Sequence, residues 1–249
     1  MKVLACYHLK GGVGKTTAAV NLAYLASTSG AKTLICDLDP QGASSYYFRV
    51  RPKFVSGAKG FLKKRKNMSK NIKGTDFDHL DIMPADLSFR HLDIKLTRFK
   101  RSKQRLRKLL SPLRKEYDFI FLDCPPNLTV VAENVFDAAD RVIVPVIPTT
   151  LSQRALEQLL SFLKRKKYPA NKLLAFFSMV EKRKKLHLEC MRELSASLDA
   201  RLLPTAIPYL ASIEKMGTTR EPIVVTAPQS AAANAYRNLW HDLQAALSG

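Results

Sequence analysis

The sequence KGGVGKTT, residues 10–17, lies between two segments of contrasting pattern. The apolar run Val3–His8 before it predicts a buried strand, and Ala18–Ala26 after it has the composition of a helix. A strand, a glycine-rich turn and a helix form the context of a phosphate-binding loop, because backbone N–H groups and the helix N-terminus then face an anion. In such a loop Lys15 can reach the outer phosphates of a nucleotide, and the hydroxyl of Thr16 can ligate Mg²⁺.

A second lysine, Lys10, precedes the glycine pair, and Leu9 occupies the position where the ordinary phosphate loop has its first glycine. Two lysines in one turn repel each other unless an anion lies between them. With this lysine the segment resembles the deviant Walker A motif of the ParA/MinD/Soj ATPases. The resemblance implies ATP and Mg²⁺ as cofactors and Lys10 and Lys15 as catalytic lysines, with Lys10 reaching phosphates held by a partner subunit. The nucleotide-binding residues that it implies in the loop are Gly11, Gly12, Val13, Gly14, Lys15, Thr16 and Thr17.

Carboxylates follow two further predicted strands. Thr33–Leu38 predicts a strand with Asp37 and Asp39 at its end, the side on which parallel α/β sheets bind ligands. The apolar run ending at Asp123 is followed by Cys124-Pro125-Pro126, whose prolines restrict the backbone. The two segments resemble switch I and the Walker B–switch II region of the same family. The resemblance implies that Asp39 is catalytic and orients the attacking water, and that Mg²⁺ is held by Thr16, Asp37, Asp39 and Asp123.

The rest of the chain alternates between strand and helix patterns. This alternation predicts an α/β fold, a P-loop NTPase with a mostly parallel twisted central sheet and helices on both faces. We expect residues 1–249 to form a single deviant-Walker P-loop ATPase domain, without an N-terminal helix-turn-helix domain. The further predicted strands are His79–Ala85, Arg141–Pro148 and Leu173–Val180, and the further predicted helices are Leu128–Ala138, Ser152–Lys164 and Ser230–Leu247.

The net charge is +20, with 41 Lys and Arg against 21 Asp and Glu. This exceeds what solubility requires, and it predicts a polyanionic partner, either nucleic acid or an anionic membrane surface. Residues 49–73 form a basic excursion with ten Lys or Arg and no acid, which is either a solvated segment or a face that contacts DNA or a partner. Residues 98–115 form a second basic block, whose apolar stripe predicts a docked helix with a cationic outer surface.

A third basic cluster, Glu181–Lys185, is predicted to open a helix. Cations at a helix N-terminus oppose the macrodipole, and a local rule broken in this way suggests a function. In ParA-like proteins this region lies on the DNA-facing side of the dimer. The resemblance therefore implies that Arg183, Lys184 and Lys185 contact DNA phosphates, and Arg220 is assigned with them.

The segment Ala206–Tyr209 resembles the adenine-side loop of the family. The resemblance implies that Pro208 and Tyr209 bind the nucleotide, although Tyr209 replaces the usual arginine. Its ring either stacks on the base or is an ordinary surface aromatic.

The resemblance implies a ParA-like ATPase that forms a homodimer with ATP and binds nonspecific double-stranded DNA. A ParB-like or other activating adaptor would stimulate hydrolysis and release the protein, in DNA segregation or cargo positioning. We expect a cytoplasmic, nucleoid-associated protein. The alternative is a MinD-type membrane-associated regulator, which needs an amphipathic C-terminal tail with a basic face. Ser230–Leu247 has instead the pattern of a core helix, so no membrane partner is predicted.

Other classes find less support in the sequence. The four cysteines form no C-x-x-C pair, which indicates reduced buried thiols and argues against an iron–sulfur reductase. No apolar run approaches the roughly 18 to 20 residues that span a bilayer. We expect no signal peptide, and no motif for a small-molecule ligase or synthase substrate stands out.

Overall fold

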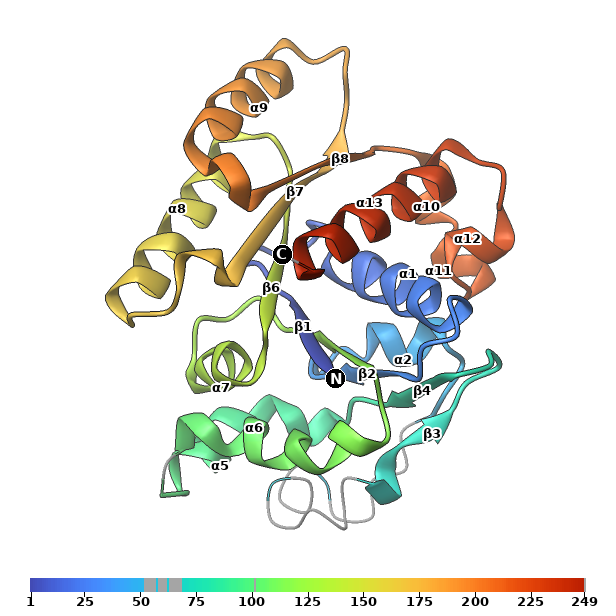
Figure 1. The fold of residues 1–249 in the computed structure, drawn as a ribbon, viewed down its shortest axis with the longest axis vertical. Helices are drawn as coiled ribbons and strands as arrows, with labels where there is room; N and C mark the ends of the chain where they lie inside the picture. The colour runs from blue at the N-terminus through green and yellow to red at the C-terminus, as the bar shows by residue number, and fades with distance from the viewer. Residues whose placement is uncertain (52–56, 58–61, 63–68, 101, 249) are drawn as a thin grey trace.

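A single sheet forms the centre of the computed structural model, which describes residues 1–51, 57, 62, 69–100 and 102–248 (Figure 1). Within these residues the sheet has eight strands in the order β3-β4-β2-β5-β1-β6-β7-β8. The paired strands are parallel except β3 and β4, which run antiparallel. The strands are β1 (Lys2–Cys6), β2 (Thr33–Asp37), β3 (Lys73–Gly74), β4 (Leu80–Met83), β5 (Phe119–Asp123), β6 (Arg141–Val146), β7 (Leu173–Val180) and β8 (Leu202–Pro208).

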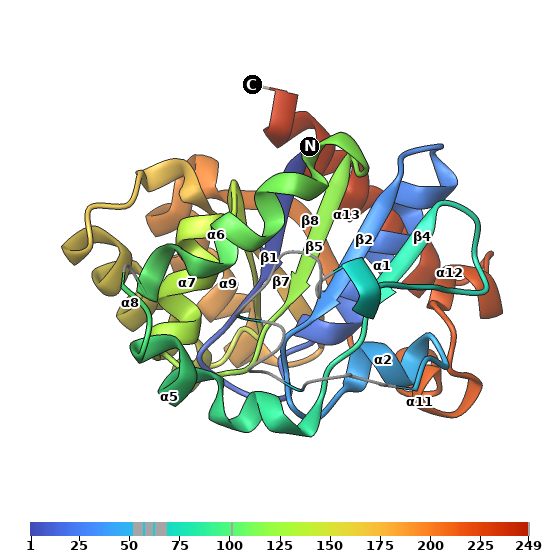
Figure 2. The ribbon, with the colours of Figure 1, turned by 90° about the horizontal axis from the view of Figure 1, so that it is seen from below.

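Helices cover both faces of this sheet, which confirms the predicted α/β class (Figure 1, Figure 2). One face carries α1 (Lys15–Thr28), α2 (Ala43–Tyr47), α10 (Ala211–Glu214), α11 (Met216–Thr219), α12 (Ile223–Thr226) and α13 (Ala231–Ser248). The other carries α5 (Leu92–Thr97), α6 (Arg105–Leu110), α7 (Val130–Ala138), α8 (Thr150–Arg165) and α9 (Lys185–Leu198).

The central strand β1 shows how the two layers are held. Val3 and Ala5 point into the core beneath α5–α9, whereas Leu4 and Cys6 point into the core beneath α1 and α13. This follows from the two-residue period of a strand, and it requires apolar side chains at every position of a strand covered on both sides. The phosphate loop therefore leaves the sheet from a strand that is covered on both faces, which fixes the position of the loop.

The second basic block does not form the continuous helix that the apolar stripe predicts. It is divided into η2 (Ser102–Gln104), α6 and η3 (Ser111–Lys115), so this prediction was wrong. Pro112 accounts for the change from α6 to η3, because proline has no backbone N–H to donate within a continuing α-helix. The stripe is nevertheless buried, as expected, through Leu106, Leu109, Leu110 and Leu113.

Two other predictions need correction. The helix expected to open at Glu181–Lys185 begins only at Lys185, and Lys182 and Arg183 form a turn before it. The edge strand β8 was not predicted, because Pro204 and Pro208 weaken the strand pattern; an edge strand tolerates proline. The basic excursion at about 49–73 lies mostly outside the described residues. None of the helices in the described ranges is both long and apolar enough to span a bilayer.

Candidate phosphate-binding site

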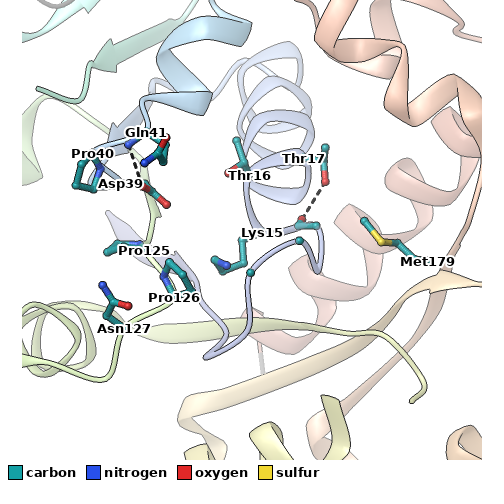
Figure 3. A pocket seen from close by; sticks show the side chains of 13 residues that line it. Lys15, Thr16, Thr17, Asp39, Pro40, Gln41, Pro125, Pro126, Asn127 and Met179 are labelled. Carbon is teal, nitrogen blue, oxygen red and sulfur yellow. Dashed lines mark hydrogen bonds between the residues drawn. The ribbon is translucent and has the colours of Figure 1, made fainter. Parts of the chain in front are cut away.

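The loop between β1 and α1 adopts backbone conformations that glycine favours. Gly12 has φ +70° and Gly14 has φ +94°, both in the left-handed region. A Cβ atom on Gly14 would lie 2.9 Å from the Oγ atom of Ser178, so this position also lacks space for a side chain. The hydroxyl of Thr17 donates to the carbonyl of Gly14 at 3.0 Å and closes the turn onto α1 (Figure 3).

The side chain of Lys15 bends back over this loop. It is 7% exposed, and its Nζ atom donates to the carbonyl of Lys10 at 3.0 Å. Burial lowers the pKa of Lys15, while the nearby Asp123 opposes the shift. The ammonium group is thus held at the centre of the loop by a neutral acceptor. A phosphate oxygen is a stronger partner, because a charge-assisted hydrogen bond is about twice as strong as a neutral one.

The buried side chain of His8 holds the backbone at the start of the loop, a role that was not predicted from the sequence. Its side chain is fully buried, and its Nδ1 atom accepts the backbone N–H of Lys10 at 2.9 Å. Burial, followed by the charges of Lys15 and Lys10, lowers the pKa of His8 to about 4. The imidazole is therefore neutral at physiological pH, which lets Nδ1 accept the hydrogen bond that fixes Lys10.

Asp37 and Asp123 are register partners at the ends of β2 and β5. Asp37 accepts hydrogen bonds from the backbone N–H and the hydroxyl of Ser45, at 2.9 and 2.7 Å. Asp123 accepts hydrogen bonds from the hydroxyls of Thr16, at 3.2 Å, and Ser44, at 2.5 Å. Both carboxylates are fully buried, and burial raises the pKa of each; the Asp123 charge further raises the pKa of Asp37.

This acid pair predicts a pH dependence of stability in the magnesium-free protein. A raised native pKa means that the native state binds more protons than the unfolded chain once the pH exceeds about 4. The pair therefore lowers the free energy of unfolding as the pH rises from about 4 through the raised pKa values. We expect Asp123→Asn to raise the free energy of unfolding at pH 8 by on the order of 1–2 kcal/mol, which raises Tm by several degrees. At pH 5 the increase in Tm should be smaller.

Thermal unfolding in EDTA at the two pH values measures this effect, with the exposed Asp76→Asn as the matched control. If Asp123→Asn lowers Tm equally at both pH values, the carboxylate is a net stabilising group and the interpretation is wrong.

A pocket of about 580 Å³ lies between the loop and the chain segments after β2 and β5. Lys15, Thr16 and Thr17 form one wall, and Asp39, which accepts the backbone N–H of Gln41 at 3.0 Å, faces them from the other (Figure 3). The full lining is Gly11, Gly12, Gly14, Lys15, Thr16, Thr17, Asp39, Pro40, Gln41, Pro125, Pro126, Asn127 and Met179.

The oxygen atoms around Thr16 have the chemistry of a magnesium site. The Thr16 hydroxyl and the Asp123 carboxylate are in contact, and both are hard oxygen donors. The described residues contain no group of three or more His, Cys, Asp and Glu side chains able to hold a metal by themselves. This fits Mg²⁺, which takes one or two protein oxygens and completes its octahedron with phosphate and water.

The remaining predicted nucleotide-binding residues lie elsewhere. Val13 does not line the pocket, and its side chain is fully buried. Pro208 borders a separate cavity of about 710 Å³, together with Val180 and Leu210. The hydroxyl of Tyr209 donates to Glu214 at 2.8 Å, and the side chain is 48% exposed.

The predicted DNA-contacting residues do not share one environment. Arg183 is exposed, while Lys184 pairs with Glu181 at 2.5 Å and Lys185 with Glu189 at 3.7 Å. Arg220 is held within the fold: its Nε atom donates to the carbonyl of Tyr46 at 2.9 Å, and its guanidinium lies 4.4 Å from the centre of that ring.

Several residues at the site had no role in the sequence analysis. Met179 lines the pocket from the end of β7, with φ +54°, an unusual conformation for this residue type. Asn127 lines the opposite side, and Ser44 and Ser45 hold the two buried carboxylates. The pair Ser44-Ser45, shortly after the acidic end of the β2 segment, was the one signal in the sequence, since small hydroxyl residues near a strand end can satisfy its carboxylates.

The chain is similar to known proteins in sequence and in fold. A family model described as AAA domain matches residues 1–176. The sporulation initiation inhibitor protein Soj of Bacillus subtilis (strain 168) is 28% identical over 249 residues, covering 98% of each chain. The structure of a putative plasmid partition protein from Borrelia burgdorferi B31, bound to AMPPNP, has a TM-score of 0.84 at 22% identity and covers 98% of each chain.

The structure of cobyrinic acid a,c-diamide synthase from Mycobacterium smegmatis, with bound ADP and magnesium, is also similar. Its TM-score is 0.81 at 24% identity, covering 100% of this chain and 96% of that one. At this level of identity, both structural likenesses concern the fold.

Proposed function

Since the chain belongs to the AAA-domain family, and within it to the ParA/MinD/Soj-type ATPases with a deviant Walker A loop, we propose that it hydrolyses ATP with Mg²⁺ and cycles on and off DNA. The ATP-bound form is a homodimer that binds nonspecific duplex DNA. Hydrolysis, stimulated by a ParB-like or other adaptor, separates the subunits and releases the DNA. The protein acts in DNA segregation or cargo positioning at the nucleoid.

The observation that carries this proposal is the buried Lys15 ammonium, held across a glycine-rich loop and facing Asp39 over one pocket. When bound, ATP supplies the γ-phosphoryl group, and Mg²⁺ offsets the charge of its phosphates. Thr16 and Asp123 hold the cation, and Asp37 keeps the segment after β2 in place through Ser45. Asp39 is left to orient the attacking water, because its carboxylate lines the pocket itself.

Lys10 is the residue that links ATP to dimerisation in this proposal. Its backbone is fixed twice, by His8 through the N–H and by Lys15 through the carbonyl, so the side chain leaves the loop in a defined direction. That side chain is only partly buried, and it does not line the pocket of its own subunit. A lysine held in this way can contact phosphates bound by a second subunit.

The experiment that tests the proposal is a titration of labelled duplex DNA without nucleotide, with ADP and with a slowly hydrolysed ATP analogue. We expect the analogue to raise DNA affinity at least tenfold, because two subunits together contact more phosphates than one. Lys10→Ala should remove this increase and the ATP-dependent dimer in gel filtration, while ATP binding is retained.

Equal DNA affinity in all three nucleotide states would refute the proposed cycle. ATP-dependent sedimentation with anionic vesicles, in the absence of DNA binding, would instead support the MinD-type alternative.

Removing the positive charges of Arg183, Lys184 and Lys185, at the start of α9, tests where the ATP-dependent DNA contact lies. We expect the variant Arg183→Gln, Lys184→Gln and Lys185→Gln to weaken DNA binding by the ATP-bound form about tenfold, because Arg183 is exposed and the lysine pairs are weak surface ion pairs. Basal ATP hydrolysis should be unchanged. An unaltered binding curve at moderate salt would exclude this cluster from the DNA contact.

A further inference from the structure

We infer that the protein has a second, weaker duplex-binding surface, on the side of the sheet away from the phosphate loop, whose contact with DNA does not depend on nucleotide. Hydrolysis then removes the stronger ATP-dependent contact, and the remaining contact is weak enough for the protein to leave the DNA. This distal basic face consists of Lys103, Arg107, Arg141, Lys166 and Lys172. The inference rests on the proposed function because it takes duplex DNA as the partner. The face contains none of the residues assigned to DNA contact above.

Contacts between three elements make the face continuous. Lys103 and Lys166 both pair with Glu133 of α7, at 2.9 and 2.7 Å, so that η2 and the end of α8 meet over one carboxylate. Helices α6 and α7 lie side by side next to α8 (Figure 1). Lys172 donates to the carbonyl of Ala139 and lies 5.5 Å from the ring of Tyr168.

Two carboxylates next to this face, Glu133 and Asp140, are already engaged by the fold. Glu133 is 9% exposed and is shared by two lysines, which leaves that triad with a net positive charge. The Oδ2 atom of Asp140 accepts the backbone N–H of Val3 at 2.7 Å. Burial is the largest cause that lowers the pKa of Lys172; the charges of Asp140 and Asp137 oppose this shift, and those of Arg107 and Arg141 add to it. The five cations of the face outnumber the neighbouring Glu133, Asp137 and Asp140, so the face keeps a net positive charge that attracts a polyanion.

The surface chemistry favours the backbone of a duplex over other polyanionic partners. All five members of the face are cationic, and none is a large exposed apolar side chain. A membrane-inserting surface would need such side chains. The nearby rings of Phe162 and Tyr168 lie beneath Lys166 and Lys172, at 5.6 and 5.5 Å, so they are not free to stack on single-stranded bases.

The position of the face separates it from the nucleotide. Arg141 begins β6 and Lys172 directly precedes β7, so both lie at the N-terminal ends of parallel strands. The phosphate loop follows the C-terminal end of β1. The two sites lie at opposite ends of the parallel strands. We therefore expect the distal basic face to be present whether or not nucleotide is bound.

The test is a titration of labelled duplex DNA with nucleotide-free protein over a series of NaCl concentrations. We expect Lys103→Gln, Arg107→Gln and Lys166→Gln together to weaken binding at least tenfold at low salt. The slope of log K against log salt should fall by about 2 to 3, since each phosphate contact contributes about 0.9. The matched control is Lys73→Gln, Arg192→Gln and Lys215→Gln, which removes the same charge from exposed positions in β3, in α9 and between α10 and α11.

A second variant excludes an effect of misfolding. Glu133→Gln releases two ammonium groups without adding a cation, so we expect nucleotide-free DNA binding to tighten severalfold. A loss of fold could not produce this gain. The inference is overturned if the face variant binds like wild type, if the control variant loses as much affinity, or if Glu133→Gln does not tighten binding.

Two other results would reassign the partner. Preferential binding of single strands, or sedimentation with anionic vesicles that the face variant abolishes, would refute the duplex assignment. The outcomes also separate this inference from the proposed function. If the ATP analogue does not raise DNA affinity but the face variant still weakens DNA binding by the nucleotide-free protein, only the proposed cycle fails. If the analogue raises DNA affinity and the face variant binds DNA like wild type, only the distal basic face fails.

Discussion

Lys15→Ala is expected to lower the affinity for ATP by at least about a hundredfold. The ammonium group of Lys15 is almost fully buried in the loop, where a hydrogen bond between opposite charges is worth about 1.5–3 kcal/mol or more. The substitution also leaves the carbonyl of Lys10 without the donor that now holds it. The loop therefore loses both its main phosphate contact and part of its own support.

Isothermal titration with Mg²⁺–ATP measures this loss, with Lys32→Ala as a control that removes an exposed lysine. Circular dichroism and thermal unfolding establish that the variant is folded. Retained ATP affinity in a folded Lys15→Ala protein would refute the assignment of the phosphate site.

Asp39→Ala is expected to reduce ATP hydrolysis by about 10²–10⁴-fold while ATP binding, the dimer and DNA binding persist. Asp39 lines the pocket, and the one hydrogen bond found for its side chain among the described residues comes from the nearby backbone of Gln41. The carboxylate is thus available to a water molecule next to the γ-phosphate. Removing it leaves the phosphate loop intact, so the variant should remain bound to DNA in the presence of ATP.

Asp37→Ala is a comparison variant that distinguishes a catalytic role, proposed for Asp39, from a structural role, proposed for Asp37. Asp37 is buried and holds Ser45 through two hydrogen bonds, so its loss should lower Tm and disturb the segment after β2. A release assay on DNA-coated beads, combined with phosphate release, distinguishes the two variants. If Asp39→Ala hydrolyses ATP at the wild-type rate, another group orients the water.

The parts of the fold that sequence predicts best are those specified by local pattern. The predicted strands Val3–His8 and Thr33–Leu38 and the run ending at Asp123 correspond to β1, β2 and β5, with differences of one or two residues at their ends. The pattern is clear because a strand covered on both faces needs apolar residues throughout. The break at Pro112 and the edge strand β8 were missed, since each depends on how proline is placed in the tertiary structure.

The site divides in a similar way. The glycine-rich loop and the acids at the strand ends could be identified, because their spacing follows from the chemistry of phosphate and metal binding. The roles of His8, Ser178 and Met179 could not be predicted, since they arise from contacts with Lys10 and Gly14 that only the folded chain creates. The engagement of Arg220 with Tyr46 likewise joins residues distant in sequence.

The paired acids Asp37 and Asp123 have a consequence for protein turnover. Two buried carboxyl groups with raised pKa values destabilise the subunit that has no cation, whereas any ligand that binds only the native state stabilises it by an amount that grows with the logarithm of the ligand concentration. Cellular proteases sample the unfolded fraction, so depletion of Mg²⁺–ATP should shorten the half-life of the protein. Its abundance would then follow the energy supply of the cell without any change in synthesis.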